Sequence, residues 1–220
     1  MEQLVVSDFG ALQTKKAGRE DSWGFRYRGL IGGLILAPAG VLAVFSPPLL
    51  EQSSYLNLLF DLFAWTTFCV GATLRIWSTL YIGCRKGCSL VTEGPYSMCR
   101  NPLYFGSLLV AISAGFFLQS VVLTAGVLAV CLWYLFATVP SEERVLRSAY
   151  DLKYEEYCRR TPRFCPNISL FETPECVEVK VHGLRIEAKR LLVWAWLPLF
   201  CQGLAFLRET AWWPTFFHVP

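Results

Sequence analysis

The chain alternates between long uncharged apolar runs and short polar segments. Leu103–Ser141 holds no charged residue over 39 positions, and Gly29–Leu50 and Leu191–Leu207 are also free of charge. A membrane-crossing helix needs about 20 apolar residues, so the longest run predicts two short helices that meet near Gln119 and Ser120. The pattern predicts five transmembrane helices, at about 29–50, 56–75, 102–118, 121–140 and 191–207.

Composition favours a membrane protein over a soluble one. Of the 220 residues, 54% are hydrophobic and 17% are charged, and the mean hydropathy is +0.41. Five apolar runs leave too little polar sequence to cover a soluble core. We therefore expect one all-α integral membrane domain over 1–220, because lipid tolerates only helices or closed barrels.

Lysine and arginine gather on alternate connections of the predicted helices, which orients them. The connections near 51–55 and 119–120 contain neither residue, whereas the segments at 1–28, 75–101 and 142–190 are rich in both. The N-terminus and both large polar segments are therefore predicted to be cytoplasmic. The net charge of +3 reflects this asymmetry, and no basic-aromatic groove for nucleic acid is visible.

The polar segments carry recognisable local signals. Residues 76–101 are rich in glycine and turn residues, and 142–160 has the spacing of an amphipathic helix that Thr161 and Pro162 end. The chain has nine cysteines but no Cys-x-x-Cys pair, so we expect no metal site. The fifth apolar run is the shortest and contains Pro198, so it either crosses the bilayer or lies in the interface.

A basic, polar and aromatic cluster lies at the start of the predicted helical hairpin 102–140. The sequence GPYSMCRNPLYFG spans 94–106, with Pro102 where a first helical turn accepts proline. A helix start and Arg100 both favour an anion. The hairpin returns the chain to the same side, so Glu142 and Glu143 are expected beside Arg100 and Asn101.

These groups suit a small zwitterion with a second cationic centre. Its carboxylate would meet the helix start or Arg100, and its ammonium would meet Glu142. The cationic centre would lie against an aromatic face, with Tyr96, Tyr104 and Tyr154 as candidates. S-adenosylmethionine presents all three groups, and methyl transfer depends mainly on positioning and exclusion of water.

At these residues the chain resembles the integral-membrane methyltransferases related to isoprenylcysteine carboxyl methyltransferase and phospholipid N-methyltransferase. The resemblance covers about 80–166, and we expect a catalytic core at about 76–166. It depends on the order and spacing of separate elements around one apolar hairpin. Those elements are LVTEGPY at 90–96, RNPLY at 100–104, EERVL at 142–146, YEEY at 154–157 and Pro162.

The resemblance implies a cytoplasm-facing pocket for S-adenosylmethionine, released as S-adenosylhomocysteine, and a lipophilic acceptor that enters from the bilayer. Arg100 and Glu142 are the candidate catalytic residues. The candidate cofactor-binding residues are Cys88, Ser89, Leu90, Val91, Tyr96, Asn101, Pro102, Leu103, Tyr104, Glu142, Glu143 and Tyr154.

Two positions depart from the carboxyl methyltransferases and leave the acceptor open. Asn101 stands where those enzymes usually have histidine, and asparagine is common among the phospholipid-type relatives. Thr138 stands where they carry a substrate-associated arginine. Carboxylate O-methylation or methylation of a related lipid-soluble acceptor is the first interpretation, and phospholipid (ethanolamine) N-methylation is the alternative.

Two non-enzymatic classes compete with this interpretation. A scaffold that keeps the fold would lack a usable cofactor pocket. A transporter would need broken helices or charges at mid-bilayer, and Asp61 is the main candidate in the apolar runs. We expect Asp61 to serve the helix bundle instead.

Overall fold

The structure is a computed structural model that describes residues 28–49, 55–83, 89–179, 181–208, 210 and 212–217. All regular secondary structure in these ranges is helical, as predicted. The elements are α3 (Arg28–Phe45), α4 (Tyr55–Ile82), α5 (Pro95–Met98), α6 (Pro102–Phe117), α7 (Val121–Trp133), the π-helix η1 (Tyr134–Thr138), α8 (Val139–Arg160), the 3-10 helix η2 (Ile168–Leu170), α9 (Val181–Trp194) and α10 (Trp196–Arg208).

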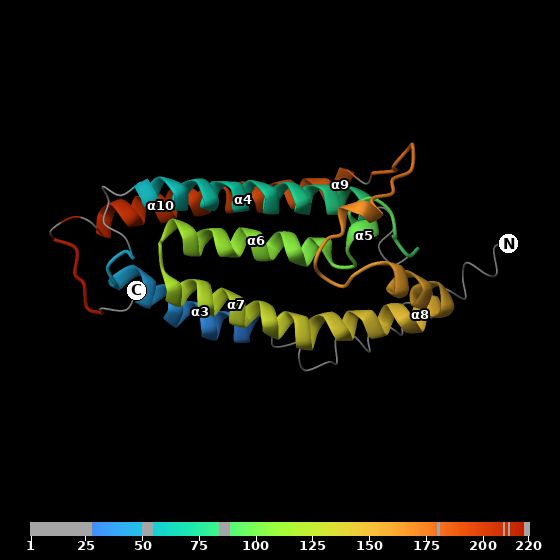
Figure 1. Cartoon of the computed structure of the whole chain (residues 1–220), viewed down its shortest axis with the longest axis horizontal. Helices are drawn as coiled ribbons and strands as arrows, with labels where there is room; N and C mark the ends of the chain where they lie inside the picture. The colour runs from blue at the N-terminus through green and yellow to red at the C-terminus, as the bar shows by residue number, and fades with distance from the viewer. Residues whose placement is uncertain are drawn as a thin grey trace.

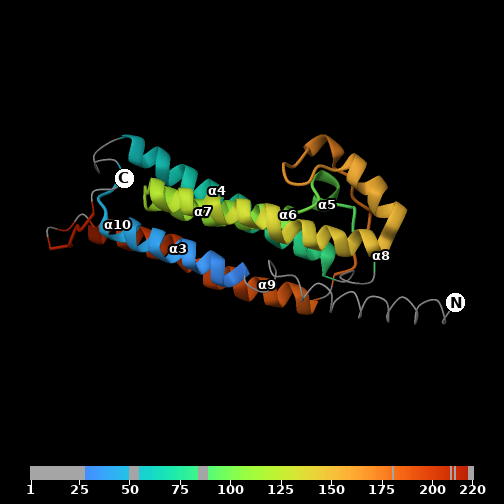
Figure 2. The ribbon, with the colours of Figure 1, turned by 90° about the horizontal axis from the view of Figure 1, so that it is seen from below.

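The long helices lie side by side and run alternately in opposite directions (Figures 1 and 2). Helix α6 packs against both α4 and α7, and α3 packs against α7. Three continuous helical stretches are long and apolar enough to cross a membrane, and α3 and α6 are shorter apolar helices. Those three stretches are Tyr55–Ile82, Val121–Arg160 and Val181–Arg208.

Each of the five predicted apolar segments forms a helix, but several boundaries differ. The first helix ends at Phe45 rather than near residue 50, since Pro47 and Pro48 follow and prolines do not continue a helix. The second continues beyond 75 to Ile82. The fifth begins at Val181, and a turn at Ala195 separates α9 from α10 just before Pro198.

The outward surface is apolar, and two glycines let α4 and α6 approach closely. Phe63, Phe136 and Phe200 are 59%, 79% and 67% exposed, as expected of side chains that face lipid. Gly71 of α4 and Gly106 of α6 face each other so closely that a Cβ on Gly71 would lie 2.7 Å from the Gly106 carbonyl oxygen. Small residues at such contacts let membrane helices approach closely.

The predicted hairpin forms, with its turn at the predicted position. Gln119 has a φ of 47° and reverses the chain, and the Ser120 hydroxyl accepts a hydrogen bond from the Leu123 amide at 3.3 Å to cap α7. The Gln119 amide donates to the Asn57 side-chain oxygen at 2.9 Å. This bond attaches the turn to α4.

The second arm of the hairpin is neither uniform nor straight. The π-helix η1 ends two residues before Pro140, and the wider turn accommodates a proline that has no N–H to donate. Asp151 has non-helical angles, with φ 43° and ψ −119°, and kinks α8. The kinked end curves toward α5 and η2, which form a cap at this end of the bundle (Figure 1).

The glycine contact predicts opposite effects for the same substitution at two glycines. Gly106→Ala should lower the free energy of unfolding by about 1–3 kcal/mol, because the new methyl group meets the Gly71 carbonyl and the Arg75 side chain within 3 Å. Gly33→Ala should be neutral or stabilising, since no described atom outside the neighbouring turns of its own helix lies within 4 Å of that Cβ. Thermal unfolding in detergent compares the two, and an unchanged midpoint for Gly106→Ala would contradict the close contact.

Candidate functional site

The loop between α4 and α6 turns sharply at Gly94. Gly94 has a φ of 60°, and a Cβ there would lie 2.4 Å from the ring of Tyr81, so only glycine fits. Its amide donates to the Glu172 carbonyl at 2.6 Å. Tyr96 and Val91 are buried in one cluster with Tyr81. The LVTEGPY element is thus folded against the end of α4.

An arginine–glutamate–arginine cluster connects the start of α6 to α8. Arg100 Nη1 lies 3.0 Å from Glu143 Oε1, and Arg163 Nη2 lies 2.6 Å from Glu143 Oε2. The Arg100 and Glu143 side chains are only 14% and 11% exposed. Arg100 Nη1 also donates to the Cys158 sulfur at 3.0 Å. The predicted return of the hairpin to Arg100 is confirmed, and Glu143 is the partner.

The segment after α8 folds back over this cluster. The Arg100 amide donates to the Pro162 carbonyl at 2.9 Å, and the Asn101 side-chain amide donates to the Arg163 carbonyl at 3.1 Å. The Tyr157 hydroxyl donates to the Tyr96 carbonyl at 2.7 Å. The conformation of 94–101 is therefore fixed by residues 60 or more positions further along the chain.

Glu142 faces a different neighbour from Glu143. It is half-buried, and its charge acts on the Tyr96 phenol. Burial raises the pKa of Tyr96 well above its usual range, and the charge of Glu142 adds to this effect while Arg75 opposes it. Tyr96 therefore stays protonated near neutral pH, close to one carboxylate and one guanidinium.

Helix α6 begins as predicted, with Asn101 as its N-cap and Pro102 in its first turn. The Asn101 side chain does not cap the helix, because it is engaged with the Arg163 carbonyl. The Tyr104 ring lies 6.1 Å from the Tyr134 ring of η1. First-turn N–H groups have no partner inside a helix, so this end suits an anion.

Most of the predicted residues are at the cap end, on three elements. Tyr96 lies in α5, Asn101, Pro102, Leu103 and Tyr104 form the start of α6, and Glu142, Glu143 and the fully buried Tyr154 lie in α8. Ser89 is exposed and Leu90 is half-buried. Cys88 lies outside the described residues. No group of three metal-ligating side chains occurs within the described ranges.

An open hollow of about 730 Å³ borders Arg100, and no α6 residue is among its lining residues. Its other lining residues come from the end of α8 and from 161–170, including Cys158 and Cys165. Apart from Arg100, none of the predicted site residues lines it. We therefore do not equate this hollow with the predicted cofactor pocket.

Two buried polar atoms at this end have no hydrogen-bond partner within the described residues. They are Arg100 Nε and Thr138 Oγ1, and Thr138 lies one helical turn before Glu142. An unpaired buried polar atom costs free energy, so a polar ligand that bonds to either atom would be favoured. This observation fits a bound polar cofactor.

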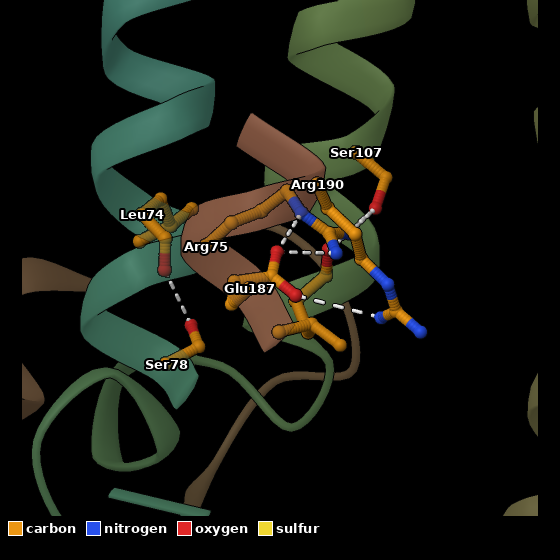
Figure 3. A network of polar contacts seen from close by, with 7 residues as sticks. Leu74, Arg75, Ser78, Ser107, Glu187 and Arg190 are labelled. Atoms are coloured by element: carbon orange, nitrogen blue, oxygen red, sulfur yellow. Dashed lines mark hydrogen bonds and ion pairs between the residues drawn. The ribbon is translucent and has the colours of Figure 1, made fainter. Parts of the chain in front are cut away.

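Sequence reasoning missed several charged contacts. Arg75 of α4 is 5% exposed and Glu187 of α9 is 3% exposed, and their side chains bond directly, as Figure 3 shows. Arg163 was read only as a cytoplasmic charge. The sequence does show that Arg75 follows directly after an uncharged run, which marks it as unusual. No nearby residue indicates that Glu187 is its partner.

The two adjacent glutamates predict separable effects. Glu143→Gln should lower the free energy of unfolding by about 3 kcal/mol, because it leaves Arg100 buried without its counter-charge. Glu142→Gln should leave stability nearly unchanged, since Glu142 forms no ion pair with the described residues. Thermal unfolding of both variants checks this, and equal midpoints would contradict the assignment of Glu143 as the structural partner.

Comparisons with known proteins find one family and several relatives similar to parts of the chain. The sequence model described as phospholipid methyltransferase matches residues 55–153, which contain α4, the loop with α5, and the hairpin. No solved structure matches the chain.

Three curated relatives are similar over parts of the chain. A nickel-cobalt-cadmium resistance protein, NccN, of Alcaligenes xylosoxydans xylosoxydans is 33% identical over 66% of this chain and 68% of its own length. A cobalt-zinc-cadmium resistance protein, CzcN, of Cupriavidus metallidurans is 45% identical over 50% and 51%. Protein-S-isoprenylcysteine O-methyltransferase B of Arabidopsis thaliana is 35% identical over 36% and 41%.

The helices are those of a membrane protein, and the family match includes the motif elements at 90–96, 100–104 and 142–146. Together with the isoprenylcysteine methyltransferase relative, these findings show that the chain belongs to the integral-membrane methyltransferase family.

Proposed function

We propose that this protein transfers a methyl group from S-adenosylmethionine to a lipophilic acceptor at the membrane. The observation that carries the proposal is the ion pair between Arg100 and Glu143, which holds the start of α8 against the start of α6. Glu142 lies beside Glu143 in α8, and Tyr96 and Tyr104 lie on either side of Arg100 along the chain. One carboxylate, aromatic faces and a helix N-terminus are what a zwitterionic sulfonium requires.

Each part of the cofactor has a candidate partner. The first turn of α6, with Asn101 and Leu103, would hold the carboxylate. Glu142 would hold the ammonium, and Tyr96 and Tyr104 would face the sulfonium. When bound, S-adenosylmethionine supplies a methyl group that an acceptor lone pair takes as the carbon–sulfur bond breaks and a neutral thioether leaves.

The protein residues contribute positioning and charge rather than proton transfer. Glu142 and the Tyr104 ring would keep the sulfonium in line with the acceptor. Arg100 holds its charge at the start of α6 through Glu143, and its Nε remains available to a ligand. Folding of 161–172 over the loop helps exclude water from this end.

The acceptor is proposed to be lipid-soluble and to arrive from the bilayer. The exposed apolar faces of the helices place lipid beside the site. Methylation of a carboxylate, as in the isoprenylcysteine enzymes, is the first candidate, and amine methylation of an ethanolamine phospholipid is the alternative. Thr138 has no charge to offer a carboxylate, so both acceptors need testing.

Two cofactor-site variants test the proposal. Glu142→Gln and Tyr104→Ala should each abolish or strongly weaken the binding of S-adenosylhomocysteine, because each removes a direct contact to one of its charged or polarisable groups. Calorimetry in nanodiscs measures the affinity, and Gly33→Ala in α3, which has no proposed contact to the cofactor, serves as a control. Unchanged affinity in both variants would refute the site.

An acceptor assay then defines the reaction. Wild-type protein with radiolabelled S-adenosylmethionine should transfer label into either fractionated membrane lipids or prenylated thiol compounds. Label that base releases as volatile methanol identifies a carboxyl methyl ester, whereas label that stays non-volatile after base identifies an amine or thioether. Absence of transfer to every fraction, together with absence of cofactor binding, would favour a scaffold that kept the fold.

The site and the N-terminus are proposed to face the cytoplasm, in a bacterial plasma membrane or the endoplasmic reticulum. The distribution of lysine and arginine supports this orientation. An impermeant maleimide should label the exposed Cys165 in inside-out vesicles but not in intact cells or right-side-out vesicles. Cys165→Ser identifies the labelled position, and labelling from outside would reverse the topology.

A further inference from the structure

Arg75 and Glu187 form a buried ion pair between α4 and α9 (Figure 3). Arg75 Nε and Nη2 lie 2.7 Å and 2.6 Å from Glu187 Oε1. The two side chains are 6% and 4% exposed. Both nitrogens converge on one carboxylate oxygen, which fixes the orientation of the guanidinium plane.

The remaining Arg75 donors point to α6. Arg75 Nη1 donates to the Ser107 hydroxyl and lies 3.5 Å from the Leu103 carbonyl oxygen. The guanidinium carbon lies 4.5 Å from the centroid of the Trp194 ring. One side chain therefore connects α4, α6 and α9 at the level of the first two turns of α6.

Holding helices together does not by itself explain this arrangement. Replacing a buried ion pair with apolar residues of similar volume is often neutral or stabilising, and the glycine contact already brings α4 and α6 together. What the pair adds is a fixed orientation of α6 relative to α4 and α9. It fixes the Leu103 carbonyl and Ser107, and Arg75 also acts on the nearby Tyr96 phenol.

We propose that Arg75 and Glu187 are positioning residues for methyl transfer, which hold the first turns of α6 in the orientation that the cofactor requires. The inference rests on the proposed function. Glu187 lies outside the region that matches the family, 55–153, so the C-terminal helices of this chain complete the support of its site.

The conservative exchange Arg75→Lys tests this role. Lysine keeps a charge for Glu187, but a single ammonium cannot also reproduce the directed bonds to Ser107 and Leu103. We expect the dissociation constant of S-adenosylhomocysteine to rise about tenfold, a change of about 1.4 kcal/mol. We also expect kcat at saturating substrates to fall about 100-fold, because small displacements at a reacting centre cost that much.

Arg208→Lys is a matched control. Arg208 is also a buried arginine that joins helix ends, with bonds to the Ser46 and Leu118 carbonyls, but it lies at the opposite end of α6. This variant should lose stability in thermal unfolding and yet keep cofactor affinity and kcat. Ser107→Ala should show a smaller loss of affinity in the same direction as Arg75→Lys.

The outcomes separate the inference from the proposed function. Failure of wild-type protein to bind S-adenosylhomocysteine would overturn both. Binding by wild-type protein with unchanged affinity and kcat in Arg75→Lys would overturn the inference alone. If Arg75→Lys and Arg208→Lys lost cofactor affinity and kcat equally, in proportion to the fall in their unfolding midpoints, the pair would serve only general stability. That result would also overturn the inference.

Discussion

The close approach of α4 and α6 at Gly71 and Gly106 is the contact on which the site geometry depends. No side chain separates the two backbones there. Arg75 follows Gly71 by one helical turn, and Leu103 and Ser107 flank Gly106, so this register brings the guanidinium to the first turns of α6. A larger residue at either glycine would move the arginine away from the carbonyl that it contacts.

Arginines attached to fixed acceptors recur at both ends of the bundle. Arg75 and Arg100 each bond to a glutamate on another helix near the cap. At the far end, Arg208 bonds to the Ser46 and Leu118 carbonyls, which terminate α3 and α6. In an apolar bundle these directional bonds supply what hydrophobic packing cannot, because lipid is as apolar as the helix surfaces.

The sequence predicts the helices well because charge is excluded over whole membrane-length segments. The turn at Gln119 and the start at Pro102 were equally readable, since both depend on local backbone chemistry. The sequence did not show which of the adjacent residues Glu142 and Glu143 pairs with Arg100. The π-helix η1 lies just before them, and its extra residue per turn rotates the face that α8 presents, in a way that regular spacing cannot anticipate.

The Arg75–Glu187 pair was beyond sequence reasoning for a different reason. Its members are 112 positions apart, and no periodicity relates residues on helices whose neighbours are set by tertiary packing. Cys88 is a predicted site residue that lies outside the described part of the chain. The positions of the motif elements from Val91 to Tyr157, in contrast, could be predicted from their order. The two arms of a short helical hairpin are antiparallel, so the elements before and after it lie at the same end of the bundle.

The shortness of α6 has a consequence for the depth of its first turn. Its 16 residues extend about 24 Å at the α-helical rise, less than the hydrocarbon thickness of about 30 Å. No residue of α6 is exposed, and its neighbours belong to helical stretches of 28 and 40 residues. The start of α6 would therefore lie below the headgroup level and inside the bundle, so an acceptor group would reach it without leaving the membrane.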